Sequence, residues 1–336
     1  MNTFGLPDSI KRECVIEFIK ARLQNSNTKI LRTNFNQWIY HNFGSGIAKY
    51  FMIPYNEKFW IVHLKNLTCD WIDGFIPIPT ISDVVSGALR NYPKLIGYNA
   101  RFLYPSSGGI ACLVKAFTRY VKKIHLNMEL MRIYPKKKVI EFSDGRGCEY
   151  DKLILSVPLI ELKDMIQEDM PKCIKEAFKG LKFNSIFNLN LGIKGKELSN
   201  KHWIYFPERD FVFFRVGFYS NFSDFMAKKD CYSIYAEVSY SNSTPVDKRI
   251  IVERIIEDLL RIGLITSRDN LIVKDIVDIK YGYIIYDRCY AEALRRITDY
   301  LKRNNIFMIG RYGRWKYMTM EDAILDGESI AKQLIL

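Results

Sequence analysis

The sequence predicts a mixed α/β protein in which helices come first and strands dominate the middle of the chain. Three observations carry this prediction. Residues 306–309 form an apolar run that a glycine and then a helical pattern follow, which is typical of a strand–turn–helix unit. Residues 183–240 hold several alternating or aromatic-rich runs, which indicate a largely antiparallel sheet. Residues 248–262 carry isoleucine and leucine at helical spacing, with charged residues on the other face.

Length and composition fit a folded chain with its own core. With 336 residues, of which 48% are apolar, we expect two or three domains or one large α/β unit. Seven scattered cysteines without a C-x-x-C pair favour a reducing cytoplasm over a disulfide framework. Four histidines without paired spacing predict no metal site. We also expect neither a secretory signal nor a transmembrane segment, because charges interrupt every apolar run.

The net charge of +13 is the unusual bulk property of the chain. A strongly basic protein suits a nucleic acid, an anionic membrane surface or a small anionic substrate. The basic residues are spread out, and the longest run, 136–138, precedes an apolar run and Asp144-Gly145, as in a solvated hairpin turn. We therefore expect no nucleic-acid partner and favour a small anionic molecule.

The first 120 residues predict a helical segment with intervening loops. Helices are expected at about 8–21, 36–44, 45–53 and 82–89, with a fifth from Gly108-Gly109 through Tyr120. Gly44-Ser45-Gly46 follows a helix rather than a strand, so it predicts a helix end and a new cap rather than a phosphate loop. Residues 54–60 and 71–79 are rich in aromatic residues and prolines, and we expect packed loops there.

The rest of the chain predicts strands, a late helix and the C-terminal strand–turn–helix unit. Strands are expected at 124–127, 129–133, 139–142, 152–158, 271–281 and 283–286, and a helix at 291–304. After the strand 306–309, Gly310-Arg311 forms a turn, and a helix begins near the acidic pair Glu321-Asp322. A strand, a glycine turn and a helix N-terminus together suit an anion such as a pyrophosphate, although an ordinary βα connection is the alternative.

Together, these segments resemble the flavin-containing amine-oxidase and protoporphyrinogen-oxidase superfamily, and most of all its UDP-galactopyranose-mutase-like branch. The resemblance runs in one order along nearly the whole chain. Its motifs are Tyr55-x-x-Lys58-x-Trp60, Gly108-Gly109 before a helix, Glu129-Leu130 in a strand, the strand end Ser156-Val157-Pro158, and Gly310-Arg311 followed by Tyr317 and Met320-Glu321-Asp322. The last motif is fairly specific, whereas each of the others is weak by itself.

The resemblance implies FAD as the cofactor and a small anionic substrate such as a nucleotide sugar. It implies cofactor contacts from Leu130, Pro158, Gly310, Arg311, Met320, Glu321, Asp322 and Ala323. It implies substrate contacts from Tyr55, Trp60, Arg215, Tyr283 and Tyr317, through aromatic faces, phenols and a phosphate-binding arginine. Ordinary packing is the alternative for these side chains. The catalytic residues stay unassigned, because no histidine, cysteine or carboxylate constellation supplies a centre of its own.

Three departures from the family separate this chain from a true mutase. No arginine lies near Gly74-Phe75, and the segment Tyr283-Ile284-Ile285-Tyr286 lacks the basic residue that the mutases carry there. The third departure is larger, because the family's βαβ unit with G-x-G-x-x-G is absent from these 336 residues. A separate polypeptide that supplies this unit, a truncated product and a non-catalytic descendant are the three explanations that we consider.

The resulting expectation is an incomplete FAD-binding Rossmann-like domain beside a helical and antiparallel-sheet substrate domain. The expected divisions are 1–100 for the helical part of the substrate domain, 101–160 for the adenine side of the FAD domain, 161–300 for the mixed sheet, and 301–336 for the C-terminal FAD-domain strand and helix. For function, we expect an FAD-dependent oxidoreductase or mutase-like flavoprotein, truncated or one part of a split enzyme. The alternative is a non-catalytic remnant or subunit that binds a partner chain or a nucleotide sugar.

Overall fold

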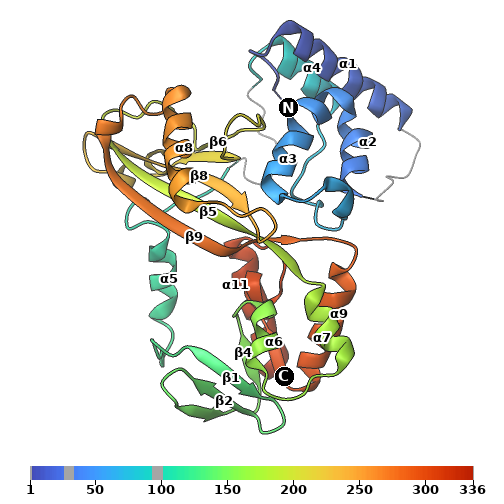
Figure 1. Cartoon of the computed structure of the whole chain (residues 1–336), viewed down its shortest axis with the longest axis vertical. Coiled ribbons are helices and arrows are strands. Elements are labelled where there is room, and N and C mark those ends of the chain that lie inside the picture. The colour runs from blue at the N-terminus through green and yellow to red at the C-terminus, as the bar shows by residue number, and fades with distance from the viewer. Residues whose placement is uncertain (1, 26–33, 93–100, 336) are drawn as a thin grey trace. The chain divides into compact units, whose positions relative to one another are not determined.

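The structure is a computed structural model that describes residues 2–25, 34–92 and 101–335. The chain divides into two compact units, and each unit combines two separate parts of the sequence (Figure 1). Unit 1 consists of Met1–Thr118 and Asn184–Gly282, and unit 2 consists of Arg119–Phe183 and Tyr283–Leu336. Among the described residues, none of the helices has both the length and the apolar character needed to cross a membrane.

The unit boundaries differ from the predicted domain boundaries. Residues 101–118 belong to unit 1, and residues 161–183 and 283–300 belong to unit 2. The reason is that two boundaries fall inside continuous strands, β5 (Lys182–Lys194) and β9 (Leu271–Ile285), rather than in linkers that composition could reveal.

The N-terminal part of unit 1 is a group of helices, as predicted. It contains α1 (Asp8–Gln24), α2 (Phe35–Ile47), the π-helix η1 (Ala48–Met52), α3 (Ile53–Trp60) and α4 (Ile81–Leu89). The helix end predicted at Gly44 is confirmed by the backbone: Gly44 has φ +71° and ψ 174°, and two helical segments of α2 meet there at a kink. A Cβ on Gly44 would lie 2.2 Å from the carbonyl oxygen of Glu17. The glycine therefore serves the close packing of α1 on α2.

The prediction of a loop at residues 54–60 is wrong, because these residues form α3. Pro54 lies in the first turn of this helix, where a missing N–H costs nothing. The predicted irregular segment at 71–79 is confirmed. The fifth predicted helix is α5 (Ala111–Thr118), which ends before Tyr120.

A five-stranded sheet forms the other part of unit 1. Its strand order is β6 (Trp203–Tyr205), β7 (Arg215–Phe218), β8 (Cys231–Tyr240), β5 and β9. The pairs β6–β7, β7–β8 and β8–β5 are antiparallel, which confirms the prediction for residues 183–240. One face packs against α8 (Lys248–Arg261) through a large apolar core that includes Phe187, Leu189, Ile234 and Ile255.

Residues that alternate with this core give the sheet a polar second face. Asn188 lies between Phe187 and Leu189 on β5, and Glu237 lies between Ala236 and Val238 on β8. Both side chains are buried, at 7% and 9% exposure. A buried polar sheet face is unusual in a packed domain, and it marks the part of unit 1 where function is to be sought.

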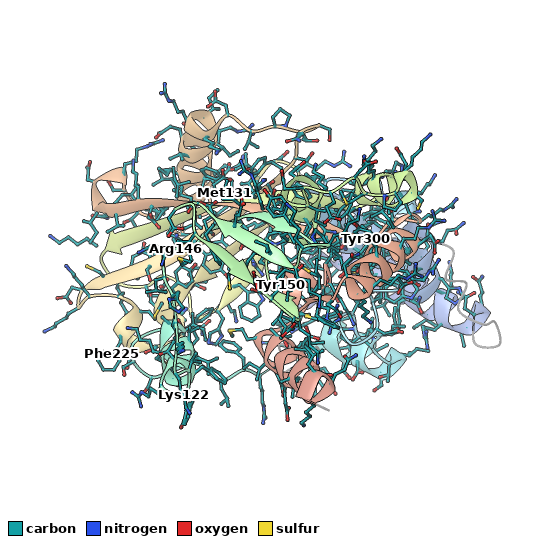
Figure 2. The ribbon with its side chains drawn as sticks, turned by 90° about the horizontal axis from the view of Figure 1, so that it is seen from below. Lys122, Met131, Arg146, Tyr150, Phe225 and Tyr300 are labelled. Carbon is teal, nitrogen blue, oxygen red and sulfur yellow. The ribbon has the colours of Figure 1, made fainter. Side chains whose placement is uncertain are left out.

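Unit 2 contains two small sheets with helices around them. The strands β1 (Leu130–Tyr134), β2 (Val139–Phe142) and β3 (Gly147–Glu149) form an antiparallel sheet, and the predicted hairpin across the lysine turn is confirmed. Figure 2 labels Met131 on β1, Arg146 in the β2–β3 turn and Tyr150 just after β3. The strand predicted at 124–127 is absent from this described segment.

The second sheet of unit 2 is a parallel pair, β4 (Leu153–Leu155) and β10 (Ile306–Met308). The helices of the unit are α6 (Leu162–Met165), α7 (Lys172–Lys179), α9 (Tyr290–Arg303), α10 (Gly310–Gly313) and α11 (Met320–Ile335). The predicted strand–turn–helix unit at 306–327 is therefore confirmed, with a short extra helix in its turn.

Candidate functional site

The parallel pair β4–β10 brings two predicted cofactor segments to one edge. Leu155 pairs with Met308, and the N–H of Ile309 donates to the carbonyl oxygen of Leu155 at 2.8 Å. Because the strands are parallel, both carboxyl ends lie at this edge. Pro158 therefore follows one strand and Gly310 the other, at the place where open α/β sheets bind ligands.

Two glycines near this edge have different roles. Gly310 has φ +69°, and a Cβ built there meets no other atom within 4 Å. A Cβ on Gly313 would lie 2.9 Å from the carbonyl oxygen of Leu155. Gly310 therefore leaves an open backbone surface, whereas Gly313 permits the close packing of α10 on the end of β4.

A charged pair fastens this turn to α11. Arg314 donates from Nη2 to Oδ1 of Asp326 at 2.8 Å and from Nε at 3.0 Å. The N–H of Gly310 donates to Oδ2 of the same carboxylate at 2.8 Å. Burial opposes the ionised form of Asp326, but the bonds from Arg314 and Gly310 outweigh burial and lower the pKa of the carboxyl. Neither Arg314 nor Asp326 was among the predicted site residues.

Arg311, Tyr283 and Tyr317, all predicted site residues, form one cluster. The Arg311 guanidinium lies 4.5 Å from the ring centroid of Tyr317 and 5.3 Å from that of Tyr283. The two rings are stacked at 6.0 Å with an interplanar angle of 19°. The arrangement places a permanent cation on two aromatic faces, which suits an anionic group with an attached planar or sugar ring.

Buried tyrosines hold the backbone under this cluster. The Tyr286 hydroxyl accepts a hydrogen bond from the N–H of Tyr317 at 2.6 Å, and the Tyr290 hydroxyl donates to the carbonyl oxygen of Trp315 at 2.7 Å. Burial raises the pKa of Tyr286, so that its phenol stays protonated. Trp315 is fully buried with φ +50°. The segment that carries Tyr317 is thus fixed from below.

The start of α11 holds four predicted cofactor residues, one of which has a structural task. Thr319 and Asp322 form a capping box, in which the Asp322 carboxylate accepts from the N–H and the hydroxyl of Thr319, both at 2.8 Å. These bonds lower the pKa of Asp322. Met320 and Glu321 are exposed and Ala323 is half-buried, so the first turn of the helix faces outward. The remaining predicted cofactor residue, Leu130, begins β1 and is half-buried.

In unit 1, the predicted substrate residue Tyr55 stands in a column of aromatic rings along one face of α3. Phe51 stacks on Tyr55 at 5.4 Å, and Phe59 stacks on it at 5.9 Å. Tyr205 of β6 meets the edge of this column at 5.0 Å. Both flat faces of Tyr55 are therefore covered by other aromatic rings.

Trp60 is 3% exposed and lies in the core of unit 1. Its ring meets the rings of Phe59 at 4.7 Å and Trp71 at 4.9 Å. In this position Trp60 packs against Phe59 of the aromatic column. It offers no exposed face to a ligand.

Arg215 lies on the polar face of the sheet, opposite Glu237 on the neighbouring strand. Its Nε donates to Oε2 of Glu237 at 2.5 Å, and the guanidinium lies 5.8 Å from the ring centroids of Phe214 and Tyr235. Cross-strand pairs of opposite charge stabilise a sheet and fix both side chains. The predicted substrate arginine is therefore held in place.

Lys58, within the Tyr55-x-x-Lys58-x-Trp60 motif, forms hydrogen bonds to three carbonyl oxygens of unit 1. The ammonium donates to the carbonyl oxygens of Phe206 at 2.7 Å, Glu208 at 2.9 Å and Phe213 at 2.6 Å. Burial lowers the pKa of this ammonium to about 8. Lys58 thus fixes the segment between β6 and β7, which leads directly into Arg215.

With this geometry established, comparison with known proteins gives the family. A model of the family described as flavin containing amine oxidoreductase matches residues 24–335. The chain belongs to the flavin-containing amine oxidoreductase family. The predicted superfamily and the predicted cofactor, FAD, are confirmed.

Solved structures of this family share the fold. Reduced UDP-galactopyranose mutase is 26% identical and has a TM-score of 0.85, with 93% of this chain and 68% of the mutase covered. A protein from Exiguobacterium sp. 255-15 that is assigned as a protoporphyrinogen oxidase has a TM-score of 0.67 at 11% identity, over 98% of this chain and 72% of its own. Putrescine oxidase bound to putrescine has a TM-score of 0.65 at 12% identity, over 100% and 77%. The last two likenesses show the fold alone.

The residues of unit 2 fit the flavin side of FAD. The open space at Gly310 lets a flat group approach the backbone at the carboxyl edge of β4 and β10. The outward-facing first turn of α11 offers N–H groups to a phosphate. We therefore assign Gly310, Arg311, Pro158 and the start of α11 as the residues of this chain that would hold the cofactor.

Sequence reasoning missed three residues that hold predicted site residues in place: Lys58 in unit 1, and Arg314 and Asp326 in unit 2. Lys58 could have been suspected, since it is the one basic residue within an aromatic motif. The pairing of Arg314 with Asp326 joins the turn after α10 to helix α11, and no local sequence pattern reveals this contact.

Proposed function

We propose that this protein is an FAD-dependent oxidoreductase or mutase-like enzyme that acts on a small anionic substrate, with nucleotide sugars as the favoured class. The observation that carries the proposal is the Arg311 guanidinium on the faces of Tyr283 and Tyr317, next to the open turn at Gly310. The 26% identity with a UDP-galactopyranose mutase supports the substrate class.

Bound FAD supplies the electron or hydride transfer, and the protein supplies binding and orientation. Arg311 binds a negative charge of the substrate, while Tyr283 and Tyr317 pack against its ring. Tyr286 keeps Tyr317 in position through the 2.6 Å bond to its backbone. In unit 1, the orientation that Glu237 gives to Arg215 suits a phosphate oxygen.

We further propose that residues outside this sequence, on the same polypeptide or a second one, supply the βαβ unit with G-x-G-x-x-G. Unit 2 supports this proposal, because it exposes apolar side chains on its parallel strand pair and on α11. Ile154 on β4 is 43% exposed, and Met320, Ile324 and Leu325 on α11 are 57%, 42% and 54% exposed. An exposed apolar surface of this kind is typical of a site that another protein segment buries.

We place the working protein in the cytoplasm. All seven cysteines are free, including the exposed Cys148, Cys173 and Cys289, which is typical of proteins in a reducing compartment.

The test is flavin content, measured as visible absorbance of the purified chain with and without a co-expressed G-x-G-x-x-G unit. We expect bound flavin with the unit present and weak or no flavin without it. UDP-galactopyranose is then offered to the flavin-loaded protein, with Arg311→Lys as the variant and Arg209→Lys, an exposed arginine paired with Glu57, as the control. Loss of turnover or substrate binding in the first variant alone supports the proposal.

A non-catalytic subunit is the second candidate, and the absence of G-x-G-x-x-G from these residues favours it. The same experiment separates the two. A chain that binds no flavin under either condition is not a flavoenzyme, and the subunit role then stands.

A further inference from the structure

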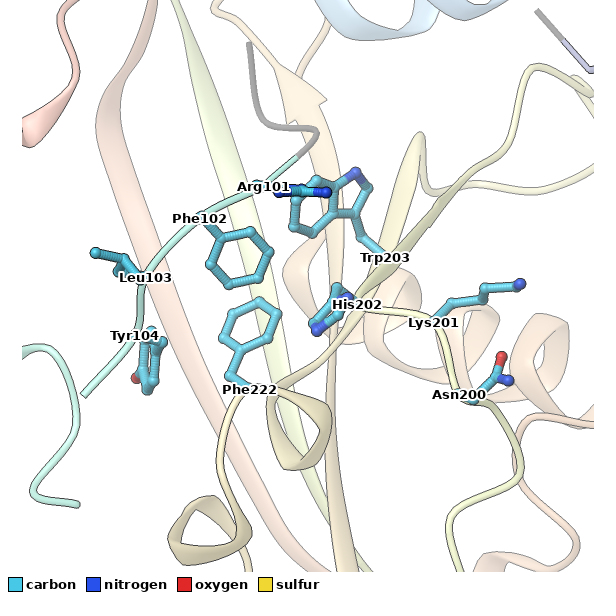
Figure 3. Close-up of a pocket in the computed structure, with 9 residues that line it drawn as sticks. All are labelled: Arg101, Phe102, Leu103, Tyr104, Asn200, Lys201, His202, Trp203 and Phe222. Atoms are coloured by element: carbon cyan, nitrogen blue, oxygen red, sulfur yellow. The ribbon is translucent and has the colours of Figure 1, made fainter. Parts of the chain in front are cut away.

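Unit 1 carries a cavity of about 590 Å³ that no predicted site residue lines. Two segments far apart in the sequence form it, one around Phe102 and the other around His202, and Phe222 closes it (Figure 3). The second segment is held rigidly. The Asn221 amide donates to the carbonyl oxygens of Ser199 at 2.8 Å and Lys201 at 2.6 Å. The wall of the cavity is therefore built in advance of any ligand.

Five aromatic rings line this cavity, and Figure 3 shows those of Phe102, His202, Trp203 and Phe222 grouped together. The Phe102 ring centroid lies 5.0 Å from that of His202, 5.7 Å from that of Trp203 and 5.4 Å from that of Phe222. Phe102 is nevertheless 40% exposed. An aromatic cluster that keeps ring surface open to a cavity is a platform on which a further planar ring can stack.

Two cations border the rings. Arg101 lies beside Trp203, and Lys201 extends from the other side of the His202 backbone (Figure 3). Both side chains are exposed, and neither forms an ion pair with any residue in the described part of the chain. The cavity therefore combines an aromatic platform with uncompensated positive charge at its rim.

The cavity continues the polar face on which Arg215 lies. On β6, Trp203 and Tyr205 point to the same side, because residues two apart on a strand share a face. Trp203 pairs with Gly217 and Tyr205 pairs with Arg215 across the β6–β7 ladder. The cavity at Trp203 therefore lies two residues along the same strands from Arg215. A ligand whose charged group binds at Arg215 can reach it.

We infer that this cavity binds a planar aromatic ring whose negatively charged substituent contacts Arg101, as in a nucleotide. The inference rests on the proposed function and adds to it the place where the aromatic part of the substrate binds. Tyr55 does not offer that place, since Phe51 and Phe59 cover both of its faces, and Trp60 is buried. Beside the two cations, ring surface is open at Phe102, which is 40% exposed, and at the half-buried Trp203.

The experiment measures binding to the flavin-free chain by tryptophan fluorescence and by calorimetry. The probes are uridine monophosphate and phenyl phosphate, compared with ribose 5-phosphate and inorganic phosphate, which lack the aromatic ring. We expect the two aromatic phosphates to bind saturably and about tenfold or more tightly than the two others. Equal binding of all four phosphates would overturn the inference.

Two variants locate the site. Trp203→Leu should weaken the aromatic probes about tenfold, and Arg101→Ala should weaken them severalfold and reduce the effect of salt. The matched controls are Phe225→Ala, a 75% exposed phenylalanine of unit 1 outside the cavity (labelled in Figure 2), and Arg209→Ala. If both Trp203→Leu and Arg101→Ala bind the aromatic probes as the wild type does, the inference is overturned. Because Arg101 is exposed, Arg101→Ala tests the inference even if Trp203→Leu does not fold.

Flavin content is measured on the same preparations with the co-expressed G-x-G-x-x-G unit. Flavin binding without binding of the aromatic phosphates counts against this inference alone. Binding of those phosphates without flavin counts against the proposed enzyme alone.

Discussion

Arg314 and Asp326 meet in a two-point ion pair, with Nη2 and Nε of the arginine at 2.8 and 3.0 Å from Oδ1 of the carboxylate. Because Oδ2 also accepts the Gly310 N–H, one carboxylate ties the turn after β10 to helix α11. The predicted cofactor residues at both places therefore depend on Asp326 for their position.

The first prediction is that Asp326→Asn destabilises unit 2 by about 2 kcal/mol, since it leaves the partly buried Arg314 without its partner. Urea unfolding measures the change. The control is Glu328→Gln on the same helix, which removes an exposed pair with Lys332 and should cost under about 0.5 kcal/mol. Equal effects of the two substitutions would contradict the role of Asp326.

The same ion pair predicts that the protein loses stability at acidic pH. The pKa of Asp326 is lower in the folded than in the unfolded protein, so its contribution is present above the unfolded pKa of about 4. That contribution is lost as the pH falls through the folded value. The stability difference between wild type and Asp326→Asn should therefore shrink on acidification, as urea midpoints at several acidic pH values can show.

The second prediction separates two glycines of one short helix. Gly313→Ala should destabilise the protein by about 2 kcal/mol, because its Cβ would press on the Leu155 carbonyl. Gly310→Ala should cost about 1 kcal/mol for its positive φ, yet weaken flavin binding strongly, since its Cβ enters the space left for the cofactor. Gly263→Ala, with φ +73° and open space in unit 1, is the control for strain alone. A Gly310→Ala protein with normal flavin affinity would remove this glycine from the site.

The third prediction concerns Lys58. Lys58→Met leaves three carbonyl oxygens without their donor and should destabilise unit 1 by about 2 kcal/mol. The pKa of Lys58 is about 8 in the folded protein, below the usual value of 10.5. Between these values the unfolded chain binds more protons, so the wild type gains stability as the pH rises through this window. The destabilisation by Lys58→Met should therefore grow from pH 8 upward, and a difference that stays flat in unfolding experiments would argue against the buried ammonium.

The fourth prediction concerns the support under Tyr317. Tyr286→Phe removes the acceptor of the Tyr317 N–H and should cost about 1–2 kcal/mol while loosening the segment around Tyr317. Hydrogen exchange at the Tyr317 amide reports this directly. Tyr240→Phe, a half-buried tyrosine of unit 1 bonded to Asp278, is the control and should leave exchange at Tyr317 unchanged.

Local patterns predicted the elements that depend on nearby residues. The strand, the glycine turn and the helix at 306–327 follow from apolar periodicity and one glycine, and the structure confirms them. The helix α3 was missed because Pro54 was taken as a helix end, although proline fits the first turn. The spacing of Tyr55 and Phe59 by four residues was the available signal.

Contacts between distant segments could not be predicted in the same way. The acceptors of Lys58 lie about 150 residues away, and their position depends on how α3 packs near the sheet. The cavity around Phe102 and Trp203 joins segments about 100 residues apart. The substrate roles of Tyr55, Trp60, Arg215, Tyr283 and Tyr317 stay predictions, as do the cofactor contacts of Leu130, Pro158, Gly310, Arg311, Met320, Glu321, Asp322 and Ala323.

The π-helix η1 (Ala48–Met52) between α2 and α3 has an evolutionary consequence. A π-turn is an α-helix with one added residue, and one residue corresponds to about 100° of rotation. Deletion of a single codon within η1 would restore an ordinary helix and turn α3 about its axis, moving the ring of Tyr55 and the ammonium of Lys58 away from their present partners. One small genetic step at this point would thus change the side chains that α3 presents to its surroundings, without any change in the sequence of the sheet.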